Sequence, residues 1–309
     1  MRIALITPAG PGTRNGNRHT ALRWAAFLRA AGHRADVSVQ WDGRRADAML
    51  ALHARRSHAS IKAFPRAKPL VVALTGTDVY RDIRTSRKAR ESLELADRLI
   101  VLQRQALNEL SSKDRSKAAV VVQSSSTRLR HAPVKRRFRV CVVGHLRAEK
   151  DPLRIVLALP LVPEPALEVV HLGAPLDPDL ERKVTAGMRS DARYRWLGSV
   201  PHARALRWMA SSHAMVISSR MEGGANVVCE ALRIGLPVLA SRIPGNVGLL
   251  GAGYRGYFAV EDERSLARLV RRAMLDRAFY RALKRQVAAR RGMVAPRSEA
   301  RALLAALEG

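Results

Sequence analysis

Two glutamates eight positions apart occupy a glycine-containing loop and the helix expected after it. Glu222 stands directly before Gly223 and Gly224, and Glu230 lies about one turn inside a helix expected to begin at Asn226. Adjacent glycines let a backbone approach a ligand closely, and amides at a helix N-terminus favour an anion such as a diphosphate. Carboxylates accept hydrogen bonds from sugar and ribose hydroxyls. The alternative interpretation is a solvated loop residue followed by a surface helix residue.

A second candidate loop lies near the start of the chain, between a strand expected at 2–7 and a helix expected from about residue 20. Its polar and flexible residues are Gly12, Thr13, Arg14, Asn17, Arg18 and Thr20. Glycines, hydroxyls and arginines before a helix N-terminus can cradle an oxyanion. The Gly-Lys-Ser/Thr of a Walker loop is absent. An ordinary strand-to-helix turn is the structural alternative.

Composition narrows the class of protein. The 309 residues are 47% hydrophobic, enough for two domains, and the formal net charge of +29 favours anionic partners. The charge is spread along the chain and aromatic content is 5%, which offers no stacking platform for specific nucleic-acid binding. No apolar stretch approaches the ~18 residues of a membrane span, and the two cysteines lack metal-ligand spacing. We therefore expect a cytoplasmic protein without a transmembrane segment.

Strand and helix patterns alternate, which predicts parallel sheets covered by helices. The expected strands are 2–7, 35–39, 47–51, 69–74, 98–102, 118–122, 139–143, 167–171, 215–218 and 237–241. The expected helices are 20–31, 86–96, 104–111, 226–234 and three pieces over 263–308. We predict an N-terminal domain over 1–123, a linker over 124–138, a second domain over 139–290 and a C-terminal helix over 291–309.

The region around the two glutamates continues with Glu-Ala-Leu and then with Gly-Leu-Pro-Val-Leu-Ala-Ser at 235–241. This pattern resembles the glutamate-seven-glutamate motif of glycosyltransferase family 4. The resemblance implies a GT-B fold, in which two Rossmann-like domains face each other across a cleft and C-terminal helices cross back to the first domain. It also implies that the second domain binds a nucleotide sugar: Glu230 holds the ribose, and Glu222 with Gly223, Gly224, Ala225, Asn226 and Val227 holds the sugar and diphosphate.

The loop Gly-His-Leu-Arg-Ala-Glu-Lys at 144–150 resembles the family's loop that neutralises the leaving diphosphate with a basic pair. Lys150 matches the lysine of that pair. His145 occupies the usual arginine position, and Arg147 is the alternative source of the second charge. Because this family uses basic residues for the leaving group, the resemblance implies no metal and no cofactor. Asp177 is accordingly interpreted as a helix cap.

A closer resemblance covers almost the whole chain. It is carried by the first glycine loop, by Leu-Thr-Gly-Thr-Asp-Val-Tyr-Arg-Asp-Ile at 74–83, by Ala-Asp-Arg-Leu-Ile-Val-Leu-Gln at 96–103, and by the loop at 144–151. These segments resemble the selenosugar synthases of selenoneine biosynthesis. The resemblance implies formation of a carbon–selenium bond from a UDP-sugar, expected to be UDP-N-acetylglucosamine, and selenophosphate. UDP, phosphate and a selenosugar are the implied products.

The residues of the first half suit an anionic acceptor. A seleno-nucleophile needs positioning rather than a general base, and arginines suit phosphate oxygens. We expect Gly12, Thr13, Arg14, Asn17, Arg18, Thr20 and Thr77 to bind the acceptor. Arg18, Arg147, Lys150 and Asp78 are the predicted catalytic residues, with Lys150 stabilising the charge that develops on UDP. For Asp78, orientation of a donor hydroxyl and capping of a turn are equal alternatives.

Three other functions compete with this interpretation. An ordinary UDP-sugar transferase would act on a hydroxyl or thiol of a small molecule or lipid. A sugar-nucleotide epimerase with the same fold would need no second substrate. A nucleic-acid-binding protein would bind any duplex in a salt-sensitive way without affinity for UDP. The motifs leave the preferred sugar and the oligomeric state open.

Overall fold

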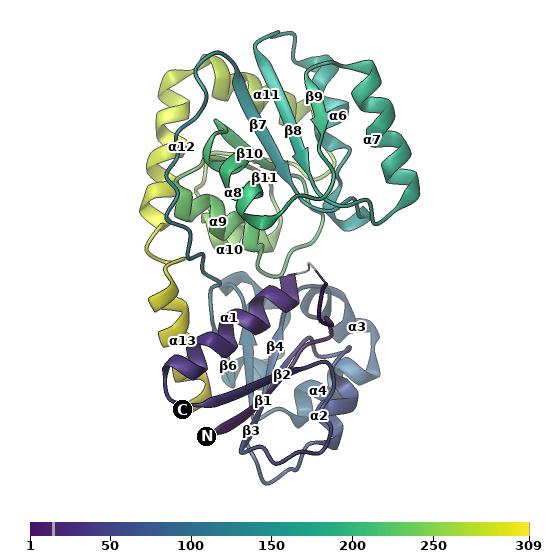
Figure 1. Cartoon of the computed structure of the whole chain (residues 1–309), viewed down its shortest axis with the longest axis vertical. Coiled ribbons are helices and arrows are strands. Elements are labelled where there is room, and N and C mark those ends of the chain that lie inside the picture. Colours follow the sequence, from purple (N-terminus) through teal and green to yellow (C-terminus); the bar gives the residue numbers. More distant parts are fainter. Residues whose placement is uncertain (14–15, 309) are drawn as a thin grey trace. The chain divides into compact units, whose positions relative to one another are not determined.

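The computed structural model describes residues 1–13 and 16–308, and the chain divides into two compact units. The first unit contains Met1–Ser124, Glu222–Asn226 and Pro296–Gly309. The second contains Ser125–Met221 and Val227–Ala295. Figure 1 shows a sheet flanked by helices in each unit.

The first unit is built on a parallel sheet in the order β2-β1-β3-β4-β5-β6. Its strands are β1 (Arg2–Ile6), β2 (Arg34–Ser38), β3 (Ala48–Leu52), β4 (Leu70–Leu74), β5 (Arg98–Val101) and β6 (Ala118–Val120). The central strands β3 and β4 are buried along their whole length. They read as continuous apolar runs because helices cover both faces of a parallel sheet.

Helices of the first unit lie on the two faces of this sheet. They are α1 (Gly16–Ala30), α2 (His58–Ala63), the π-helix η1 (Asp78–Asp82), α3 (Ile83–Thr85), α4 (Arg87–Leu95), the 3₁₀ helix η2 (Arg104–Glu109), α5 (Ser112–Ser116) and α13 (Pro296–Glu308). Trp24 of α1 and Leu303 of α13 share one apolar cluster with Ile3 and Leu5. Alternate residues of the strands pack on the other face with α2 and α4.

The second unit repeats this design in the order β12-β11-β10-β7-β8-β9, again with parallel neighbours. Its strands are β7 (Phe138–Val143), β8 (Leu167–Leu172), β9 (Tyr194–Trp196), β10 (Ala214–Ile217), β11 (Val238–Ser241) and β12 (Tyr257–Phe258). Both free cysteines, Cys141 and Cys229, are buried in this unit. They are core residues there.

The helices of the second unit connect and cover these strands. They are η3 (Ala148–Lys150), α6 (Arg154–Ala158), η4 (Leu159–Leu161), α7 (Pro178–Ser190), α8 (His202–Ala210), α9 (Asn226–Ile234), α10 (Pro244–Leu250), α11 (Glu263–Leu275) and α12 (Arg277–Arg290). Asp177 accepts hydrogen bonds from the backbone N–H groups of Asp179 and Leu180, so it caps α7 as expected.

The predicted fold class, two Rossmann-like α/β domains with a C-terminal helix on the first, is confirmed. The helix predicted over 104–111 is a 3₁₀ helix that ends at Glu109, and a separate short helix, α5, begins at Ser112. Gln103 accepts from the N–H of Gln105, and Ser111 accepts from the N–H of Asp114, so each short helix has its own cap. Within residues 1–13 and 16–308, no helix combines the length and apolarity needed to cross a membrane.

Candidate active site

In the second unit, the turn that carries Lys150 follows strand β7 directly. The Ser218 hydroxyl, just after β10, lies 3.1 Å from the Lys150 carbonyl oxygen and 2.8 Å from that of Asp151 and donates to them. The N–H of Arg220 donates to the carbonyl of Glu149 at 2.9 Å. The Asp151 backbone is left-handed, with φ of 45°, and its carboxylate accepts from Arg154 at 2.8 Å. The main chain of Lys150 is therefore braced, and its side chain is not needed for that bracing.

His145 and Arg147 lie in the same turn. His145 Nδ1 accepts a hydrogen bond from the N–H of Ala174 at 3.0 Å, which assigns the ring proton of a neutral His145 to Nε2. Arg147 is exposed and forms an ion pair with Glu149 at 3.6 Å. A Cβ on Gly173 would lie 1.8 Å from the Gly144 carbonyl oxygen, so only glycine allows these two strand-end loops to approach.

Glu230 lies on α9, the helix that the sequence predicted to follow the glycine loop. His202 Nε2 donates to Glu230 Oε1 at 2.8 Å, and the Glu230 side chain is 16% exposed. The hydrogen bond to Glu230 raises the pKa of His202 above its ordinary value. A carboxylate has about four acceptor positions, so Glu230 can still accept from a ribose hydroxyl.

Two residues beside Gly144, His171 and Trp196, stabilise the fold. His171 is fully buried, with Nδ1 2.8 Å from the Tyr194 hydroxyl and Nε2 3.2 Å from the Gly144 carbonyl oxygen. Burial lowers its pKa to about 4, so the ring is neutral at pH 7. Trp196 donates its Nε1–H to the Gly173 carbonyl at 2.9 Å. Both side chains hold the loop beside Gly144.

The segment Glu222–Asn226 belongs to the first unit. Glu222 is 8% exposed, which rules out the interpretation of a solvated loop residue. A Cβ on Gly223 would lie 2.3 Å from the Thr75 carbonyl oxygen, so this glycine is required by a close backbone contact. Asn226 accepts from Arg23 at 3.3 Å.

The glycine loop near the start of the chain is described except for Arg14, which lies outside the described residues together with residue 15. Gly12 is exposed with φ of 82°, and the Thr13 hydroxyl donates to the Gly10 carbonyl at 2.8 Å. Asn17 and Arg18 are partly exposed in the first turn of α1. Solvent therefore reaches these four described residues at least in part.

Thr20 corrects the predicted acceptor site. Its side chain is 1% exposed, and its hydroxyl donates to the Gly16 carbonyl at 2.8 Å while accepting from Gln123. Both hydrogen bonds lie inside the unit, since α1 buries this face against the sheet. Thr20 therefore supports the loop and does not face an acceptor.

Asp78 follows β4 and is fully buried. Its carboxylate accepts from the backbone N–H groups of Ala54, Thr75, Gly76 and Val79 at 2.7–3.1 Å. This arrangement occupies the acceptor positions of both oxygens. Of the two alternatives that the sequence left open, the geometry favours the turn cap over contact with a sugar hydroxyl.

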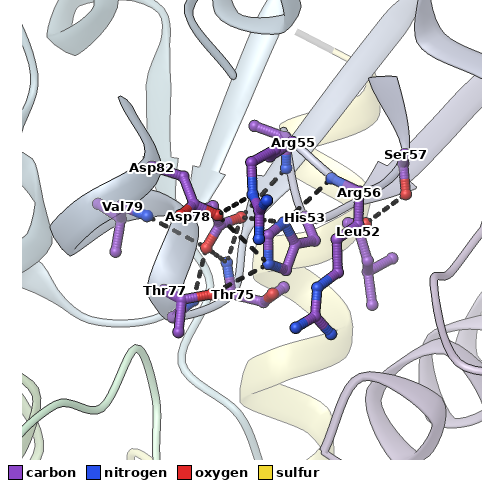
Figure 2. A network of polar contacts seen from close by, with 12 residues as sticks. Leu52, His53, Arg55, Arg56, Ser57, Thr75, Thr77, Asp78, Val79 and Asp82 are labelled. Atoms are coloured by element: carbon purple, nitrogen blue, oxygen red, sulfur yellow. Dashed lines mark hydrogen bonds and ion pairs between the residues drawn. The ribbon is translucent and has the colours of Figure 1, made fainter. Parts of the chain in front are cut away.

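Figure 2 shows a residue beside Asp78 that the sequence analysis did not select. His53 follows strand β3 with a left-handed backbone, φ of 75°, and its ring contacts Thr77 and lies close to Asp78 and Asp82. Arg55 and Arg81 both donate to Asp82. Adjacent parallel strands bring their carboxyl ends to one edge, so the position of His53 after a predicted strand was the available signal.

A second network missed by the sequence analysis holds α13 in the first unit. Glu299 is 1% exposed and accepts from Arg23 at 2.8 Å, from the Trp24 indole at 2.7 Å and from the Ser124 N–H at 2.7 Å. These partners are far apart in the sequence, which is why no local pattern indicates them. Among the described residues, no group of three or more metal-ligating side chains is found.

Two parallel α/β units, one of which carries a lysine turn and a carboxylate helix after its strands, define a GT-B-type fold. The family description "Glycosyl transferases group 1" matches residues 126–290, just over half of the chain. The protein belongs to this family of glycosyltransferases.

Comparison with individual proteins agrees with this class. Glycosyltransferase 1 domain-containing protein 1 of Xenopus tropicalis is 24% identical over 269 residues, covering 76% of this chain and 77% of the relative. The crystal structure of Anabaena HepE in complex with UDP and glucose matches with a TM-score of 0.80 at 15% identity, with 100% of both chains covered. Sucrose-phosphate synthase of Thermosynechococcus elongatus matches with a TM-score of 0.73 at 17% identity, covering 95% and 94%. At these identities the structural matches define the fold.

Proposed function

We propose that this glycosyltransferase joins the sugar of a UDP-sugar, preferentially UDP-N-acetylglucosamine, to the selenium of selenophosphate. The bond from the anomeric carbon to the UDP oxygen breaks, a carbon–selenium bond forms, and UDP leaves with the bonding electrons. Water then attacks the selenium–phosphorus bond; its oxygen goes to phosphate, and the selenium of the selenosugar takes up a proton. The resemblance of the segments at 74–83, 96–103 and 144–151 to selenosugar synthases carries this choice of acceptor.

The donor half of the proposal rests on the second unit. The braced turn at β7 presents Lys150, with Arg147 and His145 in the same turn, where charge develops on the departing diphosphate. Glu230 is our candidate ribose ligand, because its carboxylate lies in the first turns of α9 and keeps acceptor capacity beside His202. Glu222, Gly223, Gly224, Ala225, Asn226 and Val227 remain the proposed sugar and diphosphate contacts.

The acceptor half rests on the first unit. Gly12, Thr13, Asn17 and Arg18 offer an open loop before and at the start of α1, and Thr77 adds a partly exposed hydroxyl. A planar guanidinium suits phosphate oxygens through paired N–H donors, so Arg18 is our principal anion contact. The nucleophile is already anionic, which removes the need for a general base at this site.

The test is an anaerobic reaction of purified protein with UDP-N-acetylglucosamine and freshly prepared selenophosphate, analysed by mass spectrometry. We expect a hexosamine-mass product with the selenium isotope pattern and an equal amount of UDP. UDP binding without a selenium product would overturn the choice of acceptor while leaving the donor site standing. Conversion of the UDP-sugar to an isomeric UDP-sugar without any second substrate would favour the epimerase alternative, and absence of UDP binding would remove the roles given to Lys150 and Glu230.

A further inference from the structure

His53 has an unusual position for a residue with no assigned role. It follows β3, is 3% exposed, and holds a left-handed backbone with φ of 75°. This conformation is unfavourable for any residue with a Cβ, and it persists where the surroundings over-determine it. Its N–H nevertheless continues the sheet by donating to the Ala73 carbonyl at 2.8 Å. The fold therefore holds the imidazole at the carboxyl edge of the sheet.

The contacts of the ring define which nitrogen carries the proton. Nδ1 faces the backbone N–H of Arg56 at 3.4 Å and so acts as an acceptor. Burial lowers the pKa of His53, and the nearby Asp78 offsets this only in part, so the ring is neutral at pH 7. The single proton is then on Nε2, which lies 3.1 Å from the Thr77 hydroxyl oxygen. His53 donates to Thr77.

This donation keeps the Thr77 hydroxyl proton from pointing toward His53. Thr77 precedes the π-helix η1, and its side chain makes no capping hydrogen bond to that helix. With one lone pair of Oγ1 occupied by His53, the hydroxyl hydrogen points elsewhere, and Thr77 is partly exposed. Figure 2 shows the imidazole between Thr77 and the Arg56 backbone. The Thr77 hydroxyl can therefore donate a hydrogen bond to another group.

The acidic neighbours do not compete for that proton. Asp78 is occupied by backbone N–H groups, and its Oδ2 lies 3.8 Å from His53 Nδ1. Asp82 accepts from Arg55 at 2.8 Å and from Arg81 at 3.2 Å. Burial raises the pKa of Asp82, but the hydrogen bonds from the two arginines outweigh it and leave the pKa below its ordinary value. Both carboxylates are therefore engaged by other donors, Asp78 by backbone N–H groups and Asp82 by arginines.

We propose that His53 is a positioning residue that aims the Thr77 hydroxyl, as a hydrogen-bond donor, at an anionic oxygen of the acceptor. This inference rests on the proposed function, because it takes the acceptor site to be in the first unit. It adds that the acceptor presents an oxyanion at Thr77 and that His53 acts through Thr77 without touching the acceptor.

The test is a double-mutant cycle on the full chain, with inorganic phosphate titrated by calorimetry into UDP-saturated protein. The variants are His53→Asn, Thr77→Val and their combination; asparagine tolerates the left-handed backbone and keeps the fold, but it is too short to reach Thr77. Each single change should weaken phosphate binding about tenfold, the value of one hydrogen bond to a charged group, and the double variant should be no weaker than Thr77→Val.

Controls separate positioning from a structural role. UDP affinity should be unchanged in each variant and each should be fully folded at the assay temperature, Thr77→Ser should retain phosphate binding, and His33→Asn in the same unit should behave as wild type. Additive losses in the cycle, full binding by His53→Asn, or no phosphate binding by the wild type would each overturn the inference. If the losses are non-additive as expected but no selenium product forms, only the proposed acceptor is refuted. If selenium product forms but the losses in the cycle are additive, only the role of His53 is refuted.

Discussion

The strand-end turns of the two units are stabilised in different ways. In the second unit, the turn that carries Lys150 is braced through its main chain by the Ser218 hydroxyl and the Arg220 N–H. In the first unit, the turn after β4 wraps around the Asp78 carboxylate, which accepts from four backbone N–H groups. The first device acts through main-chain carbonyls of the turn, whereas the second uses a charged side chain as a fixed part of the fold.

This difference separates residues that resemble each other in sequence. A buried carboxylate must be fully hydrogen-bonded, and once it is, it has little capacity left for substrate. The turn at Lys150 is held through main-chain carbonyl oxygens, so these hydrogen bonds do not involve the lysine side chain. Two histidines differ in a similar way: His171 is hydrogen-bonded to the buried Tyr194 hydroxyl and to the Gly144 carbonyl, whereas His53 donates a hydrogen bond to the partly exposed Thr77.

The largest effect is expected for Asp78→Ala. Several buried N–H groups would lose their acceptor, each at about 1–3 kcal/mol, so we expect a loss of about 3–5 kcal/mol in unfolding free energy. Urea unfolding followed by circular dichroism measures this loss, with Asp36→Ala on the exposed edge strand β2 as a control. Loss of activity with unchanged stability would show that Asp78 acts on substrate and would contradict its role in stabilising the turn after β4.

Lys150→Ala should reduce catalysis strongly while sparing the fold. Removing one preorganised group that stabilises transition-state charge typically lowers kcat by about 10²–10³-fold. UDP release under saturating substrates measures the effect, and Lys183→Ala on the exposed face of α7 is the matched control. A variant that retains more than a tenth of wild-type turnover would mean that Arg147 or His145 carries the charge instead.

Acid should destabilise the second unit through His171. Its pKa is about 4 in the folded protein because it is buried, and about 6.5 when exposed. Between these values the unfolded chain binds the extra proton, so unfolding free energy falls by about 1.4 kcal/mol for each pH unit below about 6.5, and the fall ends near pH 4. Burial also lowers the pKa of His131 to about 4, which adds to the slope.

Urea unfolding at a series of pH values measures this dependence. The His171→Gln variant should lose its share of the slope while still meeting the Tyr194 hydroxyl. If the variant and the wild type show the same slope between pH 6.5 and 4, His171 is not the titrating group and its structural role must be revised.

A small stability change is expected for Ser218→Ala, at about 1 kcal/mol for a net hydrogen bond. Its effect on turnover should exceed what this loss of stability explains, because Lys150 would no longer be held. Thermal unfolding and kcat, measured together and compared with Ser190→Ala at the end of α7, separate the two effects. Equal, minor changes in both variants would show that the bracing of Lys150 is unimportant.

Local patterns predicted much of this architecture. The helix at 226–234 and the three-part helical tail match α9, α11, α12 and α13 because amphipathic spacing and caps such as Asp262 and Asp276 act within a few residues. The end of the 3₁₀ helix at Glu109 and the new short helix at Ser112 were missed, since Gln103 and Ser111 each cap a separate helix. Thr20 was assigned to the acceptor because sequence does not reveal which face of α1 is buried.

By itself, the sequence determined the alternation of strands and helices, the two parallel α/β halves, the family motif around Glu222 and Glu230, and the lysine turn at 144–150. These features depend on short-range periodicity and on spacing within single loops. Only the tertiary structure decided that Asp78 is enclosed by backbone amides, that Glu299 holds α13 to α1, and that His53 meets Thr77. The physical reason is that such contacts join residues from different strands and helices, whose side chains become neighbours only when the sheet aligns their ends.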